Sequence, residues 1–317
     1  MNTGKIVRSL DMVKPRAPIR NYGTVFTAVT QSPSKGYSTL SGLNTNLDKV
    51  VWENTNFRLA MPDKLDPHYK PTFSAGASEG GVLFLSARSK EQTDPPTRQL
   101  HAIDLTSGIT LWRHTDQPIT EKNNKGAYKS DDGIPMIIDH KVIIKVQGLN
   151  GPVSSTTNPY GEGLRAFDKK TGKILWTTKA HPKQQIINRV GAGSIVVTEV
   201  QTGKEKAIWG YSTTDGSLVW KRSISTNAAL LCSSGGAFYV GERIVDEKNE
   251  WKDTRMQGFD GETGTLLWTT SLPDKFFQYD INSPWNIESP RGGYPVWTID
   301  RDGAIYGVTL RGAYKMK

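Results

Sequence analysis

The residues of this sequence whose types could serve in catalysis or metal binding are one serine between glycines and five histidines. Residues 76–80 read GASEG, which matches the Gly-x-Ser-x-Gly pattern that presents a nucleophilic serine. That pattern requires a strand that enters a sharp turn and is followed by a helix, whereas here the strand-like segment GVLFLSA follows. We therefore interpret Ser78 as a turn residue.

The histidines and the single cysteine do not suggest a metal site. None of the histidines has the short spacing of ligands on one element; they are His68, His101, His114, His140 and His181. His101 and His114 flank a predicted hairpin and are expected to form a cross-strand pair on the surface. Cys232 stands alone, which excludes an internal disulfide or a cysteine cluster, and we expect it to be a small buried hydrophobe. The sequence predicts no catalytic group, no metal and no cofactor.

Composition and charge favour a β-rich protein with acidic partners. Of the 317 residues, 36% are hydrophobic, and 31 glycines and nine tryptophans suit a fold of strands and turns. The net charge of +9 implies an acidic partner, but lysine and arginine are scattered, which argues against nucleic acid. No apolar stretch has transmembrane length, and the N-terminus lacks the apolar core of a signal peptide.

A ten-residue pattern recurs along the chain. Residues 167–176 read FDKKTGKILW, and the pattern reduces to Asp-x-x-x-Gly-x-x-x-Trp. Three copies are complete: Asp104, Gly108 and Trp112; Asp168, Gly172 and Trp176; Asp260, Gly264 and Trp268. Two copies are eroded: Asn44, Asp48 and Trp52; Ser212, Gly216 and Trp220. A sixth copy is barely recognisable as Val308, Gly312 and Met316. The copies end 44 to 64 residues apart, about the length of a four-stranded propeller blade.

Each copy has the composition of a tight β-hairpin. Asp or Asn bonds its own backbone two residues on, and Gly supplies the positive φ that closes the turn. Apolar segments on both sides of the turn are two strands, and two more precede them in each unit. We expect each Trp to dock against a neighbouring unit, where a small residue just before the Asp position leaves room. These small residues are Gly42, Ala102, Ala166, Gly210, Gly258 and Gly307.

Repeated four-stranded units predict an all-β fold, a single β-propeller of about six four-stranded blades with tryptophan-docking repeats. We expect residues 20–317 to form the propeller, with residues 1–19 as an N-terminal segment. Ring closure is expected to recruit a segment from residues 3–29.

The repeat resembles the quinoprotein (PQQ-type) β-propeller repeat, whose tryptophan-docking motif joins Ala, Asp, Thr-Gly and Trp. The strongest matches are RAFDKKTGKILW at 165–176 and QGFDGETGTLLW at 257–268, within a resemblance that covers roughly residues 20–317. The resemblance implies a fold and no particular activity, because the family includes dehydrogenases and non-enzymatic scaffolds of the outer-membrane β-barrel assembly lipoprotein type. This chain is too short for the larger propellers of the dehydrogenases and lacks their cysteine pair, so it is nearer the scaffolds.

Loop lengths predict one binding face. In a four-stranded meander, the loops between second and third strands share a face with the links between blades. These connections are long, unlike the tight third-to-fourth turns: 88–98, 148–163, 243–255, 115–132 and 271–292. Their aromatic and basic side chains are the predicted partner-binding residues: Trp251, Phe276, Phe277, Tyr279, Trp285, Arg291, Lys122, Lys125 and Tyr128. Alternatively, Trp251 packs on its own hairpin and the aromatics of 271–292 plug the central channel.

We therefore expect a non-enzymatic scaffold that binds an acidic protein through this face, in a cell-envelope assembly or as a neutralising partner. One alternative is a small-molecule site for a quinone or sugar in the central channel, including a quinone-dependent oxidoreductase. Another is a binder of cell-wall polysaccharide. The resemblance implies the periplasm or the envelope if a leader was removed; otherwise we expect the cytoplasm.

Overall fold

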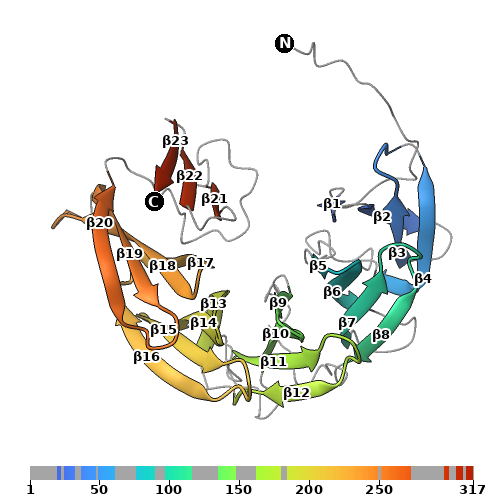
Figure 1. The fold of residues 1–317 in the computed structure, drawn as a ribbon, viewed down its shortest axis with the longest axis horizontal. Coiled ribbons are helices and arrows are strands. Elements are labelled where there is room, and N and C mark those ends of the chain that lie inside the picture. Colours follow the sequence, from blue (N-terminus) through green and yellow to red (C-terminus); the bar gives the residue numbers. More distant parts are fainter. Residues whose placement is uncertain are drawn as a thin grey trace. The chain divides into compact units, whose positions relative to one another are not determined.

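The described part of the protein consists of β-strands and turns (Figure 1). The computed structural model describes residues 20–22, 25–32, 37–47, 49–60, 76–89, 97–115, 135–147, 162–179, 184–248, 251–272, 296–299, 305–309 and 312–316. Within these ranges there is no helix with the length and apolar character needed to cross a bilayer. The predicted all-β class is confirmed.

The chain divides into two compact units, described separately here: residues 1–159 with 164–177, and residues 160–163 with 178–317. The described residues of the first unit form three four-stranded sheets. Residues 162–163, which begin the third strand of the third sheet, are assigned to the second unit. The first sheet contains β1 (Arg20–Asn21), β2 (Phe26–Ser32), β3 (Tyr37–Leu43) and β4 (Val50–Ala60). The second contains β5 (Ala77–Glu79), β6 (Val82–Ser89), β7 (Thr97–Asp104) and β8 (Thr110–Thr115). The third contains β9 (Met136–Ile138), β10 (Lys141–Gln147), β11 (Glu162–Asp168) and β12 (Ile174–Thr177).

Among its described residues, the second unit contains two four-stranded sheets and one three-stranded sheet. The fourth sheet contains β13 (Gln184–Ala192), β14 (Ile195–Thr202), β15 (Glu205–Ser212) and β16 (Leu218–Ile224). The fifth contains β17 (Ala228–Ser234), β18 (Ala237–Val245), β19 (Trp251–Asp260) and β20 (Leu266–Leu272). The sixth contains β21 (Val296–Ile299), β22 (Ile305–Thr309) and β23 (Gly312–Met316).

Every sheet is an antiparallel meander in which strands follow one another in chain order. This is the predicted blade pattern, complete in five sheets and present as three strands in the sixth. Because β1 and β2 pair within the first sheet, residues 20–21 and 26–32 belong to that sheet. Residues 1–19 lie outside the described residues, so the predicted ring closure stays a prediction.

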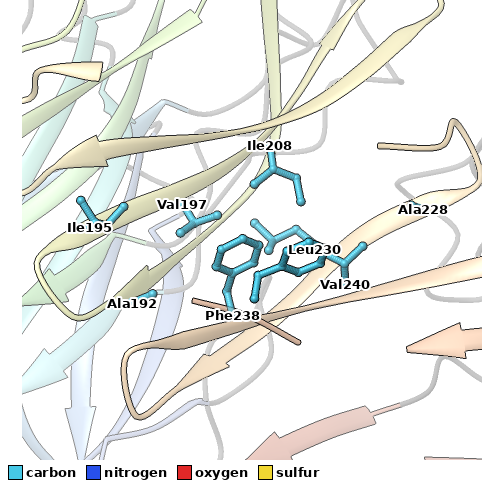
Figure 2. Packing of buried hydrophobic residues seen from close by; sticks show 9 residues of the cluster. Ala192, Ile195, Val197, Ile208, Ala228, Leu230, Phe238 and Val240 are labelled. Carbon is cyan, nitrogen blue, oxygen red and sulfur yellow. The ribbon is translucent and has the colours of Figure 1, made fainter. Parts of the chain in front are cut away.

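Apolar side chains fill the space between the first and second, the second and third, and the fourth and fifth sheets. Figure 2 shows the cluster between the fourth and fifth sheets, where Phe238 of β18 lies among Val197 and Ile208 of the fourth sheet. The ring of Phe238 stacks on those of Trp220 and Phe259, with ring centroids 5.5 and 5.1 Å apart. Each fully buried apolar side chain of this size stabilises the fold by about 1.5–3 kcal/mol. A sheet therefore depends on its neighbours for its stability.

The hairpin of β18 and β19 corrects one predicted loop. Residues 243–255 were expected to form a long connection, but β18 continues to Val245 and β19 begins at Trp251, directly opposite. A cross-strand ion pair between Lys252 Nζ and Asp246 Oδ2, 3.0 Å apart, links the ends of the two strands. The predicted loops at 88–98 and 148–163 are likewise shortened, because β6 and β7 pair out to Ser89 and Thr97 and β11 begins at Glu162.

Candidate interaction site

The repeated turn is held by the side chain of its aspartate. In the third sheet, Asp168 Oδ1 accepts hydrogen bonds from Thr171 N and Thr171 Oγ1, both at 2.7 Å, and from Lys170 N at 3.1 Å. Gly172 has a φ of 71°, the left-handed region where side chains are disfavoured. The Thr171 hydroxyl, followed by the backbone N–H groups, lowers the pKa of Asp168. The same turn occurs at Asp104 and Asp260.

Each docked tryptophan completes the turn of the next sheet. Trp112 Nε1 donates to the carbonyl oxygen of Lys169, the residue after the aspartate, at 3.0 Å. The ring also covers Gly172, where an added Cβ would lie 2.5 Å from Trp112 Cδ2. The predicted docking of Trp on a neighbouring unit is therefore correct at this junction. Two other junctions repeat it: Trp52 with Leu105 and Gly108, and Trp220 with Gly261 and Gly264.

The small residues before the aspartates have a different place from the one predicted. We expected them to make room in the neighbouring unit, but they pair across the hairpin with the tryptophan of their own sheet. Gly42 is opposite Trp52, and a Cβ there would lie 2.1 Å from Trp52 Cε2. Ala102 is opposite Trp112 in the same register. Each of these indoles is thus enclosed between a small residue of its own sheet and the turn glycine of the next.

A second set of bonds ties the repeated turn to its own sheet. The residue after the aspartate donates its N–H to the turn between the first and second strands: Lys169 N to His140 O at 2.7 Å, and Gly261 N to Gly236 O at 2.8 Å. Side chains join neighbouring sheets at the same edge, where Ser194 Oγ donates to Glu262 and Lys169 pairs with Glu79. These tight turns are therefore engaged in structural bonds.

A buried ion pair in the fourth sheet was not expected from the sequence. Lys206 Nζ lies 2.7 Å from Glu199 Oε1, and the two side chains are 9% and 2% exposed. Glu199 Oε2 accepts from Leu230 N at 2.9 Å, and Lys206 Nζ donates to Ala228 O at 2.7 Å, so both charges bind the first strand of the fifth sheet. The only signal in the sequence is a glutamate inside the apolar run IVVTEV.

The predicted partner-binding residues lie almost entirely outside the described residues. These are Phe276, Phe277, Tyr279, Trp285, Arg291, Lys122, Lys125 and Tyr128. Trp251 is the exception, and its backbone begins β19 opposite Val245. It therefore belongs to a strand and not to the middle of a long loop, and its role in binding stays a prediction.

The two histidines of the second sheet do not form the expected surface pair. His101 is opposite Arg113 and is buried, at 1% exposure, with Nε2 2.9 Å from Gln99 Oε1. His114 is opposite Leu100, and its ring lies 4.9 Å from that of Phe167 in the third sheet. His101 therefore lies in the core, on a side of β7 where its neighbour Gln99 is also buried.

Burial makes His101 a source of acid sensitivity. Desolvation, and then the charge of Arg113, lower its pKa from 6.5 to about 3. As the pH falls, His101 is therefore protonated in the unfolded chain before it is protonated in the folded chain. The free energy of unfolding keeps its full value above pH 6.5 and falls by about 1.4 kcal/mol per pH unit between pH 6.5 and pH 3. We expect the free energy of unfolding to be about 2 kcal/mol lower at pH 5 than at pH 7, as measured by urea denaturation. A His101→Gln variant that lost as much stability over this range would contradict the assignment.

The sixth sheet corrects the predicted sixth copy of the repeat. That copy was read as Val308, Gly312 and Met316, but Gly307 is opposite Tyr314 and Thr309 is opposite Gly312. Tyr314 therefore occupies the register position that tryptophan has in the other sheets. The turn between β22 and β23 has two residues, whereas the complete copies have five between the aspartate and the following strand.

Comparison with known proteins agrees with this architecture. BamB from Moraxella catarrhalis is 14% identical, with a TM-score of 0.51 over 94% of this chain and 68% of that one. Hydrazine synthase from Kuenenia stuttgartiensis is 12% identical, with a TM-score of 0.50 over 97% and 76%. Quinohemoprotein alcohol dehydrogenase from Comamonas testosteroni, 13% identical, has a TM-score of 0.45 over 94% of this chain and 52% of that chain, so this chain spans about half of that enzyme.

At identities this low, the likenesses with TM-scores of 0.50 and 0.51 support the β-propeller fold and no activity. No curated protein matches the sequence. A family model described as outer membrane protein assembly factor BamB matches residues 36–228 and 96–284, which together make up more than half of the chain. The chain therefore belongs to this family of PQQ-type repeat propellers, nearer to BamB than to the dehydrogenases.

Proposed function

We propose that this protein is a non-enzymatic scaffold that binds a protein partner during assembly of the cell envelope, on the periplasmic side of an outer membrane. The observation that carries the proposal is the match of residues 36–228 and 96–284 to a family model described as an outer membrane protein assembly factor. The likeness in fold to BamB from Moraxella catarrhalis agrees with it. A frame of linked hairpins suits this role, because it holds recognition segments without taking part in chemistry.

The proposed binding face is the one that carries the long connections. The opposite edge of each sheet carries the tight turns, whose groups bond to one another, as in the contact of Ser194 with Glu262. Recognition is therefore assigned to the predicted aromatic and basic residues around Trp251, Phe276 and Phe277. The net charge of +9 favours a partner with an acidic surface.

The test is recovery of a partner from the envelope fraction of the native bacterium. The intact chain is compared with a triple variant, Trp251→Ala, Phe276→Ala and Phe277→Ala, whose folding is first confirmed by its melting curve. We expect the variant to recover about tenfold less of the partner or even less, because aromatic anchors dominate binding energy.

The matched control removes three exposed side chains from the tight turns, through Thr106→Ala, Lys170→Ala and Thr214→Ala. This variant is expected to recover the partner as well as the intact chain does. Equal recovery by the two triple variants would contradict the assigned face, and failure of the intact chain to bind any envelope protein would contradict the proposed function.

A further inference from the structure

Strand β20 differs from the other fourth strands in its exposure. In β8, exposed residues alternate with half-buried ones, and the half-buried side carries the tryptophan. In β20 the alternation is lost, because every residue from 265 to 271 is exposed. Trp268 is 38% exposed, compared with 8% for Trp52 and 7% for Trp176. We name residues 266–271 the β20 surface.

Half of a docking site for Trp268 is already formed. A Cβ at Gly258, which is opposite Trp268 in the hairpin, would lie 2.5 Å from Trp268 Cε2. The ring of Tyr239 lies beside the indole with ring centroids 5.9 Å apart. Among the described residues, however, Trp268 Nε1 has no acceptor of the kind that Trp52, Trp112 and Trp220 have. Within the described ranges, no other sheet supplies the second half of this docking site.

The hairpin of β22 and β23 is too short for the turn that this half-site requires. At the three complete junctions the acceptor turn has an aspartate-type loop and a glycine with φ between 66 and 73°. Thr309 at the end of β22 is opposite Gly312 at the start of β23, so two residues separate these strands and a five-residue loop does not fit between them. The sixth sheet contacts the fifth through β21 and β17, at the opposite edge of the fifth sheet from β20.

The β20 surface also lacks the charges that β4, β8 and β16 carry, a property that it shares with the shorter fourth strand β12. The whole of β20, LLWTTSL, has no charged residue, whereas β8 contains Arg113 and β16 contains Lys221 and Arg222. Charged residues on edge strands oppose pairing with other chains, so their absence leaves this edge open to it. Leu266 and Leu267, 44% and 56% exposed, add apolar area on either side of the strand.

We propose that the β20 surface binds a β-hairpin of a partner protein, and that Trp268 is its anchor. The three filled junctions define the chemistry of this hairpin: a turn with an unpaired backbone carbonyl for the indole N–H and a glycine in the left-handed conformation beneath the ring. An uncharged strand next to that turn fits the leucines and threonines of β20. This inference rests on the proposed function, because it assigns one surface to the partner.

The probe is a hairpin that has the acceptor chemistry of this protein's own third sheet. A peptide with the sequence of residues 165–176 is cyclised, since short free hairpins are marginally stable, and carries Trp176→Phe to keep its own indole silent. Its hairpin is verified by NMR before use. The full chain is labelled with 5-fluorotryptophan, and the resonance of Trp268 is identified from a Trp268→Phe variant.

We expect the peptide to shift the Trp268 resonance in a saturable way. Trp268→Ala is expected to weaken binding by about 30-fold or more, as for an aromatic hot spot, when binding is followed by the fluorescence anisotropy of a dye attached to the peptide. A peptide with Gly172→Val should bind at least about tenfold more weakly, because its Cβ and methyl groups meet the indole. The control, Val219→Ala, removes an exposed aliphatic side chain of β16 at the position that corresponds to Leu267 of β20, and should leave binding unchanged.

Several outcomes would overturn the proposal. These are no saturable shift with the folded peptide, equal binding by the Trp268→Ala chain, and equal binding of the Gly172→Val peptide. Protection of Trp268 from a soluble paramagnetic quencher in the free chain would show that this chain covers its own site. Dimerisation that Trp268→Ala abolishes would instead identify a second copy as the occupant. If the peptide experiments fail while recovery of the envelope partner still depends on Trp251, Phe276 and Phe277, the role of the β20 surface is contradicted but the proposed function is not.

Discussion

Replacing Lys206 by methionine is expected to lower the free energy of unfolding by about 4 kcal/mol. The substitution leaves the carboxylate of Glu199 buried, at 2% exposure, without the ammonium group 2.7 Å away. It also removes the hydrogen bond to the carbonyl of Ala228 in the neighbouring sheet. Urea denaturation at neutral pH measures the change, and Lys204→Met, an exposed lysine in the adjacent turn, is the matched control.

A double-mutant cycle separates the coupling energy between Lys206 and Glu199 from the destabilisation that each single substitution causes. Glu199→Gln alone should also destabilise, because Lys206 is then buried beside a neutral amide and Leu230 N loses a charged acceptor. The variant with both substitutions is expected to lose clearly less stability than the sum of the two single changes. Strict additivity, or a loss for Lys206→Met no greater than that for Lys204→Met, would contradict the coupling.

Gly172→Ala is expected to destabilise the protein by about 3 kcal/mol, which combines a left-handed backbone strain of about 1–2 kcal/mol with an overpacking cost of similar size. The backbone at Gly172 has a φ of 71°, and the new methyl carbon would lie 2.5 Å from Trp112 Cδ2. The indole cannot move away freely, because its other side is opposite Ala102 and its Nε1 is bonded to Lys169 O.

Gly203→Ala is the matched control for this substitution. Gly203 has a φ of 63° and no atom within 4 Å of an added Cβ, so it bears the backbone strain without the clash. Its expected loss is about 1 kcal/mol. Denaturation curves that give equal losses for Gly172→Ala and Gly203→Ala would rule out a tightly enclosed indole.

The hairpins could be predicted from the sequence because their information is local. Asp168, Thr171 and Gly172 determine one turn through bonds that span at most five residues, so their spacing alone identifies it. The partner of Trp112 could be predicted as a neighbouring unit from the repeat, but not as Gly172 in particular. That choice depends on how two sheets pack, which the periodicity of one chain segment does not encode.

Other features depended on pairings that local pattern does not reveal. Residues 243–255 look like a charged loop, yet opposite charges such as Glu242 and Arg255 pair across β18 and β19 and extend both strands. The sixth copy was misread because its short turn moves the aromatic position to Tyr314. Glu199 and Lys206 come together only because β14 and β15 are neighbours.

The docking bonds run in one direction along the chain, from a tryptophan in an earlier sheet to a carbonyl in a later one. Trp52 serves Leu105, Trp112 serves Lys169, and Trp220 serves Gly261. During synthesis on the ribosome, each donor tryptophan therefore emerges before the turn whose carbonyl accepts its hydrogen bond. A newly made hairpin can then pack against a sheet that has already formed. Deletion of C-terminal sheets should accordingly leave the turns of the preceding sheets with their tryptophan donors. Deletion of an N-terminal sheet removes the tryptophan that donates to the turn of the next sheet.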